Sequence, residues 1–254
     1  MAITIKSERE IELMAEAGKI LERVHNELEK ALRPGMSTKD IDTLGEEIIR
    51  SYGCIPSFLN YNGYPASICV SLNQEVVHGI PDKHRIIQEG DIVSLDAGVI
   101  YKGYHSDAAR THAVGEVSEE AKKLIQVTKE SFFEGIKFAK AGNHLFDISG
   151  AIGRYAEERG YGVVRDLCGH GIGTALHEAP EIPNYEVGRK GVRLRPGMTL
   201  AIEPMINIGT HEVDWLDDDW TVVTRDGSLS AHYENTILIT EGEPRILSLT
   251  CENE

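Results

Sequence analysis

The sequence lacks the features that would mark a membrane, secreted or nucleic-acid-binding protein. No apolar run reaches the roughly 18 residues of a transmembrane helix, and the first residues, MAITIKSERE, lack the apolar core of a signal peptide. Lys- or Arg-rich runs are also missing, and the formal net charge is −15. Non-specific nucleic-acid binding needs a basic face. We therefore expect a cytoplasmic protein that contacts neither membranes nor nucleic acid directly.

Cysteines are few and scattered. The chain has four, at Cys54, Cys69, Cys168 and Cys251, and no Cys-x-x-Cys pair. This spacing favours a reducing compartment and argues against a structural zinc site built on thiolates. Apolar residues make up 41% of 254 residues, which is enough for a large core. The length allows one large α/β domain or two small ones.

Hydrophobic periodicity predicts helices followed by strands. Helices are expected at 7–32, 38–52, about 118–140 and about 145–160, the first opened by a Ser/Glu capping pattern. Residues 90–115 alternate like a β-hairpin that turns at Lys102-Gly103. Further strand-like segments lie at 161–173, 198–209, 221–225 and 232–240. The pattern predicts a mixed α/β (α+β) protein.

The chain also repeats itself at a constant offset of 107 positions. The matching pairs are Gly35/Gly142, Asp40/Asp147, Ile41/Ile148, Gly53/Gly160, Gly90/Gly197 and Asp96/Glu203. Such a repeat indicates two related halves, at about 10–115 and 118–245, within one domain. If the halves pack about a pseudo-twofold axis, Asp96 and Glu203 face each other near that axis.

Two carboxylates are predicted to lie together on the hairpin. A two-residue turn at 102–103 places Asp96 opposite Ala109 and Asp107 opposite Gly98. The two aspartates are then diagonal neighbours on one face, ~7–8 Å apart at Cα. Buried together they would raise each other's pKa, and a divalent cation would remove the repulsion. The alternative is that both face solvent and cap turns.

Three more residues extend this candidate metal site. Glu203 and Glu234 stand in otherwise apolar strands, where a lone carboxylate is costly, and His170 lies between glycines in CGHGIG. An oxygen-rich set with one imidazole suits divalent Mn, Fe, Co or Zn, and bridging carboxylates hold two ions ~3.5–4 Å apart. We expect the glycines to let a substrate backbone approach the strand that carries His170.

Several long strings resemble the type I methionine aminopeptidases. They are NYNGYPASICVSLNQEVVHGIP (60–81), SLDAGVIYKGYHSDAART (94–111), CGHGIGTALHEAPEIPNY (168–185), RPGMTLAIEPMINIG (195–209) and DGSLSAHYENTILIT (226–240). The resemblance runs from about residue 3 to residue 250. It implies the pita-bread fold, with two pseudo-twofold-related halves around a central antiparallel sheet and helices outside.

The resemblance also implies an activity and a site. The activity is metal-dependent removal of the initiator methionine, preferably before a small second residue, by a metal-bridged hydroxide that attacks the first carbonyl. Two divalent ions (Co, Mn, Fe, Zn or Ni) would be held by Asp96, Asp107, His170, Glu203 and Glu234. Catalytic roles fall to His78, His177 and Glu203. Tyr61, Tyr64, Cys69 and Trp220, with Leu176 beside them and with His78 and His177, would bind the substrate.

The implied partners are nascent polypeptide N-termini at the ribosome, bound by a monomer. Two other functions compete. One is an Xaa-Pro dipeptidase or proline aminopeptidase of the same fold, although such enzymes carry a large extra N-terminal domain. The other is a metal-free relative that serves as a binding module.

Overall fold

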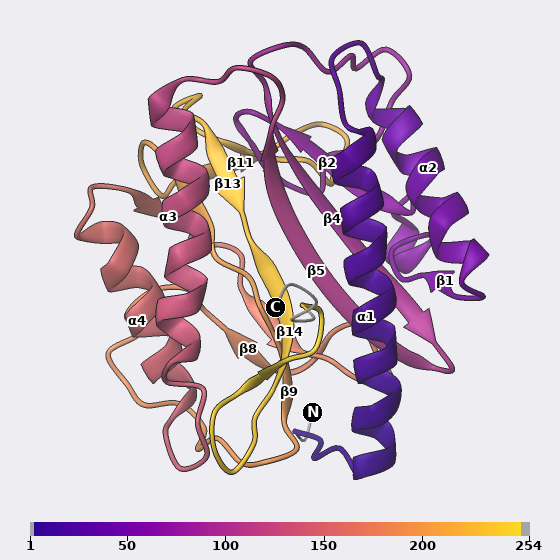
Figure 1. Ribbon diagram of the computed structural model, residues 1–254. Coiled ribbons are helices and arrows are strands. Elements are labelled where there is room, and N and C mark those ends of the chain that lie inside the picture. Colours follow the sequence, from indigo (N-terminus) through magenta and orange to yellow (C-terminus); the bar gives the residue numbers. More distant parts are fainter. Residues whose placement is uncertain (1–2, 250–254) are drawn as a thin grey trace.

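In the computed structural model, which describes residues 3–249, four helices cover one face of a long antiparallel sheet (Figure 1). The helices are α1 (Glu8–Ala31), α2 (Thr38–Ser51), α3 (Glu119–Ile136) and α4 (Leu145–Glu157), which confirms the four predicted from periodicity to within a few residues at each end. Helix α1 begins at a capping box in which Ser7 and Glu10 satisfy each other's backbone amides.

The strands of the described residues form a nine-stranded sheet, in the order β1-β4-β5-β14-β9-β7-β8 with β2 on β4 and β15 on β14, and two three-stranded sheets. Their bounds are β1 (Ile55–Pro56), β2 (Ile68–Leu72), β3 (Glu75–Val77), β4 (Ile92–Tyr101), β5 (Tyr104–Ala113), β6 (Gly162–Val163), β7 (Gly169–Gly171), β8 (Glu178–Ile182), β9 (Thr199–Ile202), β10 (Met205–Asn207), β11 (Val213–Trp215), β12 (Val222–Thr224), β13 (Ser230–His232), β14 (Glu234–Leu238) and β15 (Arg245–Ile246). A single helical turn spans Tyr61–Gly63.

The predicted hairpin is confirmed residue by residue. Strands β4 and β5 pair with Tyr101 opposite Tyr104, and the register continues to Ile92 and Ala113. Lys102 and Gly103 both have positive φ, +49° and +87°. These angles fit the tight turn whose twist matches that of the flanking strands, and a two-residue turn fixes every later pair.

The helix-covered face of the sheet is apolar. Leu21, Val24 and Leu28 of α1 are fully buried in one cluster with Leu95 and Val99 of β4. Burial of five such side chains stabilises the fold by roughly 1.5–3 kcal/mol each. Since strand side chains alternate, the neighbours of Leu95 along β4 point to the other face, and that face holds the polar groups described below.

The repeat of 107 positions is visible in the backbone. Isolated antiparallel bridges join Ser37 to Ile86 in the first half and His144 to Arg193 in the second, and both members differ by 107. Ser37 and His144 are also the residues that precede α2 and α4. In each half, the residue that precedes the second helix thus bridges to a residue outside the named strands at the equivalent position.

Short elements were not all foreseen. Strand β8 lies in HEAPEIPNY, which has no alternating pattern, and it pairs with β7 at the edge of the large sheet. The thiols of Cys54, Cys69 and Cys168 are free, and Cys251 lies outside the described residues. Within residues 3–249, none of the helices is both long enough and apolar enough to span a bilayer.

Candidate active site

Five neighbouring strands of the large sheet each contribute one potential metal ligand. In sheet order these are Asp96 on β4, Asp107 on β5, Glu234 on β14, Glu203 just after β9, and His170 on β7. The sequence separates them by up to 138 positions, and the sheet brings them into a single pocket. The structure therefore assembles the whole predicted ligand set.

Strand register places these side chains on the face away from the helices. Asp96 and Glu234 both pair with Ala109, from opposite sides of β5. Asp107 lies two residues before Ala109, so its side chain points the same way. On the other side of β14, His170 pairs with Ala201, two residues before Glu203. The predicted diagonal arrangement of Asp96 and Asp107 is thus confirmed by the register.

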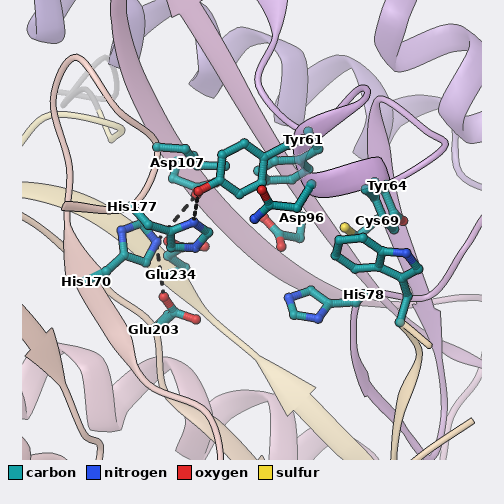
Figure 2. A pocket seen from close by; sticks show the side chains of 14 residues that line it. Tyr61, Tyr64, Cys69, His78, Asp96, Asp107, His170, His177, Glu203 and Glu234 are labelled. Atoms are coloured by element: carbon teal, nitrogen blue, oxygen red, sulfur yellow. Dashed lines mark hydrogen bonds and ion pairs between the residues drawn. The ribbon is translucent and has the colours of Figure 1, made fainter.

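The ligand atoms lie close together. One atom each from Asp107, His170 and Glu234 lies within 4.8 Å of the other two. Nε2 of His170 is 3.9 Å from Oδ2 of Asp107 and 3.6 Å from Oε1 of Glu203 (Figure 2). Nδ1 of His170 is hydrogen-bonded to the carbonyl oxygen of Gly171 at 2.8 Å. Nδ1 must therefore carry the proton, which leaves Nε2 as a free lone pair facing the carboxylates.

Burial and mutual repulsion oppose ionisation of the carboxyl groups. Burial raises the pKa of Asp96 to about 8. Burial and the neighbouring carboxylates hold the pKa values of Asp107, Glu203 and Glu234 well above the usual range. For His170 burial acts in the other direction and lowers the pKa to about 3. The imidazole is therefore neutral at pH 7.

Several buried carboxylate oxygens of the cluster lack a hydrogen-bond partner within the described part of the chain. Among the described residues, Asp96 Oδ1, Asp107 Oδ1 and Glu234 Oε1 are buried without a hydrogen-bond partner. Buried polar atoms are rarely left in this state. Four carboxylates and one neutral imidazole match the ligand preferences of divalent Mn, Fe, Co or Zn, so the residues present fit a metal centre.

This electrostatic strain predicts how the stability of the metal-free protein depends on pH. Where the folded state keeps carboxyl protons that the unfolded chain has lost, the free energy of unfolding falls as pH rises, by about 1.4 kcal/mol per pH unit for each such proton. Between pH 7 and 8 we expect this loss for chelated protein, because Asp96 has a pKa of about 8. Histidines with lowered pKa, such as His170, oppose this loss near pH 7, because about a quarter of each is still protonated in the unfolded chain there, and their opposition fades as the pH approaches 8.

Urea unfolding in the presence of a chelator, at several pH values between 7 and 8, measures this slope. The same series with added Mn²⁺ is the control and should be flatter, because the bound ion takes the place of the protons. A metal-free protein whose stability is constant across this range would contradict the proposed burial of like charges.

Two further histidines flank the cluster. His78 has a left-handed backbone, φ +60°, which is uncommon outside glycine, and its ring lies edge-on to Trp220 with centroids 6.2 Å apart. Burial lowers the pKa of His78 to about 4. The ring of His177 lies 4.1 Å from that of His170, and its Nδ1 is hydrogen-bonded to the Tyr61 hydroxyl at 2.7 Å. Both imidazoles therefore border the space beside the ligands (Figure 2).

A cavity of about 160 Å³ adjoins the ligands. Its walls include Tyr64, Cys69 and Trp220, with Tyr61 beside His177. Cys69 pairs with Asp96 across β2 and β4, which explains how a buried thiol reaches the ligand cluster. The rings of Tyr64 and Trp220 meet edge to face at 5.1 Å. The space is a narrow, mostly apolar slot that ends at the carboxylates.

The glycines on either side of His170, Gly169 and Gly171, are packed tightly against neighbouring strands. A Cβ on Gly169 would lie 2.4 Å from the carbonyl oxygen of Ala201, and one on Gly171 would lie 2.2 Å from that of Ala179. These oxygens belong to the neighbouring strands β9 and β8. Glycine is therefore required at both positions by the close approach of adjacent strands, and the expected approach of a substrate to this strand stays a prediction.

The profile of metallopeptidase family M24 matches residues 12–241. The chain belongs to this family. It is 58% identical over 250 residues to a methionine aminopeptidase of Clostridium acetobutylicum, covering 98% of this chain and 100% of that protein. It superposes on the crystal structure of a methionine aminopeptidase from Thermotoga maritima with a TM-score of 0.96 and 47% identity, covering 98% and 100% of the two chains. The predicted family and pita-bread fold are thereby confirmed.

Solved structures of proteins with other names are less similar. An Xaa-Pro dipeptidase from Bacillus anthracis superposes with a TM-score of 0.77 and 27% identity. The match covers 98% of this chain but 63% of the dipeptidase. The comparison therefore disfavours the dipeptidase alternative, since the similarity to the aminopeptidases is higher and extends over their full length.

Two residues that line the cavity were not predicted from the sequence. Phe58 and Asn62 also line the cavity. Asn62 lies in the short helical turn with φ +50°, and Phe58 precedes that turn. Asn-Gly at 62–63 marks a turn in the sequence, but nothing in a turn signal says that it borders a pocket.

Proposed function

We propose that this chain is a metal-dependent aminopeptidase that removes N-terminal methionine from peptides and nascent proteins, with a preference for a small second residue. The observation that carries the proposal is the position of a mostly apolar slot directly beside five convergent metal ligands. The names of the relatives, which share up to 58% identity over their full length, support the same activity.

The ligand roles are those that the family resemblance implies, and the order of the strands in the sheet is compatible with them. Asp96 would hold one ion, His170 and Glu203 the other, and Asp107 and Glu234, from the adjacent strands β5 and β14, would bridge them. Divalent ions would neutralise the carboxylates, acidify a water molecule and polarise a carbonyl group, which the protein side chains alone cannot do. The identity of the ions and the number bound are part of the proposal.

Three side chains are assigned to the reaction itself. We assign His177 the tautomer in which the Tyr61 hydroxyl donates to Nδ1, so that Nε2 carries the proton and donates a hydrogen bond to the first peptide carbonyl as negative charge develops there. Glu203 accepts the proton of the attacking water. His78, which is neutral at pH 7, hydrogen-bonds to the leaving nitrogen.

The slot explains the choice of the first residue. A straight, polarizable methionine side chain fits a narrow wall formed by Tyr64, Cys69 and Trp220, with Tyr61 and Leu176 at its sides. The backbone of the substrate then lies at the carboxylate end of the slot, where the free amine and the first carbonyl meet the ligands.

The activity is tested with chelated protein to which Co, Mn, Fe, Zn or Ni is added back. We expect hydrolysis of Met-Ala-Ser and little or no hydrolysis of Ala-Pro-Ser. Cleavage of the proline substrate alone would favour the dipeptidase alternative. A folded protein that is inactive with every ion would favour the metal-free binding module.

The setting of the activity is also proposed. Nascent chains present N-terminal methionine in the cytoplasm, and we propose that a monomer acts on them at the ribosome. Sedimentation of the protein with translating ribosomes, compared with a ribosome-free extract, tests this location. If the protein is recovered only in fractions that contain no ribosomes, the proposed location is contradicted.

A further inference from the structure

The segment before α1 is tied to the loop that carries His177. The backbone amide of Lys6 donates to the carbonyl of Gly197 at 2.7 Å. Its Nζ lies 2.6 Å from Oε2 of Glu178, and the two side chains are only 4% and 13% exposed. The hydroxyl of Thr4 donates to the same carboxylate oxygen at 2.6 Å. An N-terminal strap, residues 4–7, is thus anchored by a largely buried ion pair to the residue that follows His177.

Glu178 in turn holds the rest of the loop at 173–178. Its other oxygen, Oε1, accepts a hydrogen bond from the amide of Ala175 at 3.3 Å. The amide of His105 on β5 donates to the carbonyl of Gly173 at 2.8 Å. A Cβ on Gly173 would lie 2.4 Å from Cε of Lys6, so the lysine side chain runs directly across this glycine. The loop is therefore clamped between β5 and the strap.

We propose that Lys6, acting through Glu178, is a positioning residue that holds His177 in the orientation needed to meet the scissile carbonyl. The inference rests on the proposed function of His177. Lys6 lies outside residues 12–241, which the family profile matches, so the profile gives it no role. The strap thus makes the N-terminal segment part of the active site without touching the substrate.

The buried ion pair suits this purpose because its geometry is restrictive. A charge-assisted hydrogen bond shielded from water is short and directional, and loss of one partner leaves a buried charge that must move toward solvent. Oε1 of Glu178 would then release the amide of Ala175. His177, bonded to its neighbour Glu178 by the main chain, would shift with it. Displacement of a catalytic group by about 1 Å can lower turnover by about 100-fold.

The test compares Lys6→Met with Lys19→Met, which removes a lysine of α1 that pairs with Glu16 and whose side chain is 43% exposed. For Lys6→Met with metal and Met-Ala-Ser we expect kcat to fall about 10- to 100-fold and KM to change less than about twofold, because the contact of His177 develops in the transition state. Metal affinity should be unchanged, since no ligand is altered. Lys19→Met should match the parent, and Lys6→Arg should recover most of kcat.

A readout independent of activity is hydrogen exchange of metal-free protein. We expect the amides of residues 173–178 to exchange faster in Lys6→Met and unchanged in Lys19→Met. If Lys6→Met does not fold, the double variant Lys6→Met/Glu178→Gln takes the place of the single variant in both assays. The double variant leaves no unpaired buried charge at this position.

Each outcome bears on one proposal. An unchanged kcat in Lys6→Met would overturn the positioning role. So would a fall in kcat accompanied by a matching loss of metal affinity or of melting temperature. An inactive parent with every ion would overturn the proposed function instead, and faster exchange at 173–178 would still show that the strap holds the loop.

Discussion

Replacing Glu203 by glutamine is expected to lower kcat on Met-Ala-Ser by about 10²–10⁴-fold, because an amide cannot accept the proton of the attacking water. The same change should stabilise the metal-free protein at pH 8 by on the order of 1–3 kcal/mol. Burial and the carboxylates of Asp107 and Asp96 raise the pKa of Glu203, so this carboxyl costs the metal-free fold stability at pH 8 whether it is ionised or kept protonated, and glutamine removes that cost. One substitution thus changes activity and metal-free stability in opposite directions.

The matched control is Glu181→Gln. Glu181 pairs with His170 across β7 and β8, but its side chain is exposed. We expect parent-like turnover and stability from it. Steady-state kinetics with saturating metal and urea unfolding with a chelator measure the two effects. Parent-like turnover in folded, metallated Glu203→Gln would refute the proton-acceptor role, and unchanged metal-free stability would refute the charge repulsion.

The second large effect is expected from His177→Ala, which should lower kcat by about 10²–10³-fold with little change in KM. Loss of one donor to a developing oxyanion typically costs this much. His177 lies beside His170 but is no ligand in our assignment, so metal affinity should persist. The measurement is kcat and KM together with calorimetric titration of the metal.

His84→Ala provides the control, because His84 is an exposed histidine that does not line the cavity. His177→Asn keeps an N–H donor on a shorter side chain and should recover part of the loss. If His177→Ala retains full kcat, the carbonyl must be polarised by other groups, and the assignment of His177 fails.

The ligand cluster was predictable because local rules fix long-range geometry in a hairpin. The two-residue turn at Lys102-Gly103 determines every pair between β4 and β5, so Asp96 and Asp107 could be placed on one face from the sequence alone. The repeat then relates Asp96 to Glu203. Glu234 and His170 were found by a weaker signal, a polar residue in an apolar or glycine-rich strand.

Other features could not be predicted, for identifiable physical reasons. The contact of Lys6 with Glu178 joins residues 172 positions apart, and neither residue belongs to a periodic pattern that would predict it. Strand β8 lacks alternation because the edge of the sheet leaves its side chains only partly buried. The glycines beside His170 respond to carbonyl groups of strands that are distant in sequence, so their reason emerges only from tertiary packing.

The contribution of one ligand from each of five adjacent strands has a consequence for the dimensions of the centre. Neighbouring strands lie about 4.7–4.9 Å apart, a spacing that backbone hydrogen bonds set and side chains barely change. Asp107 on β5 and Glu234 on β14, the carboxylates proposed to bridge two ions, therefore stand on strands whose separation the sheet sets. The main chain therefore sets the spacing of the ligands. We expect this spacing to persist when many of the surrounding side chains are substituted, as long as the strands keep their register.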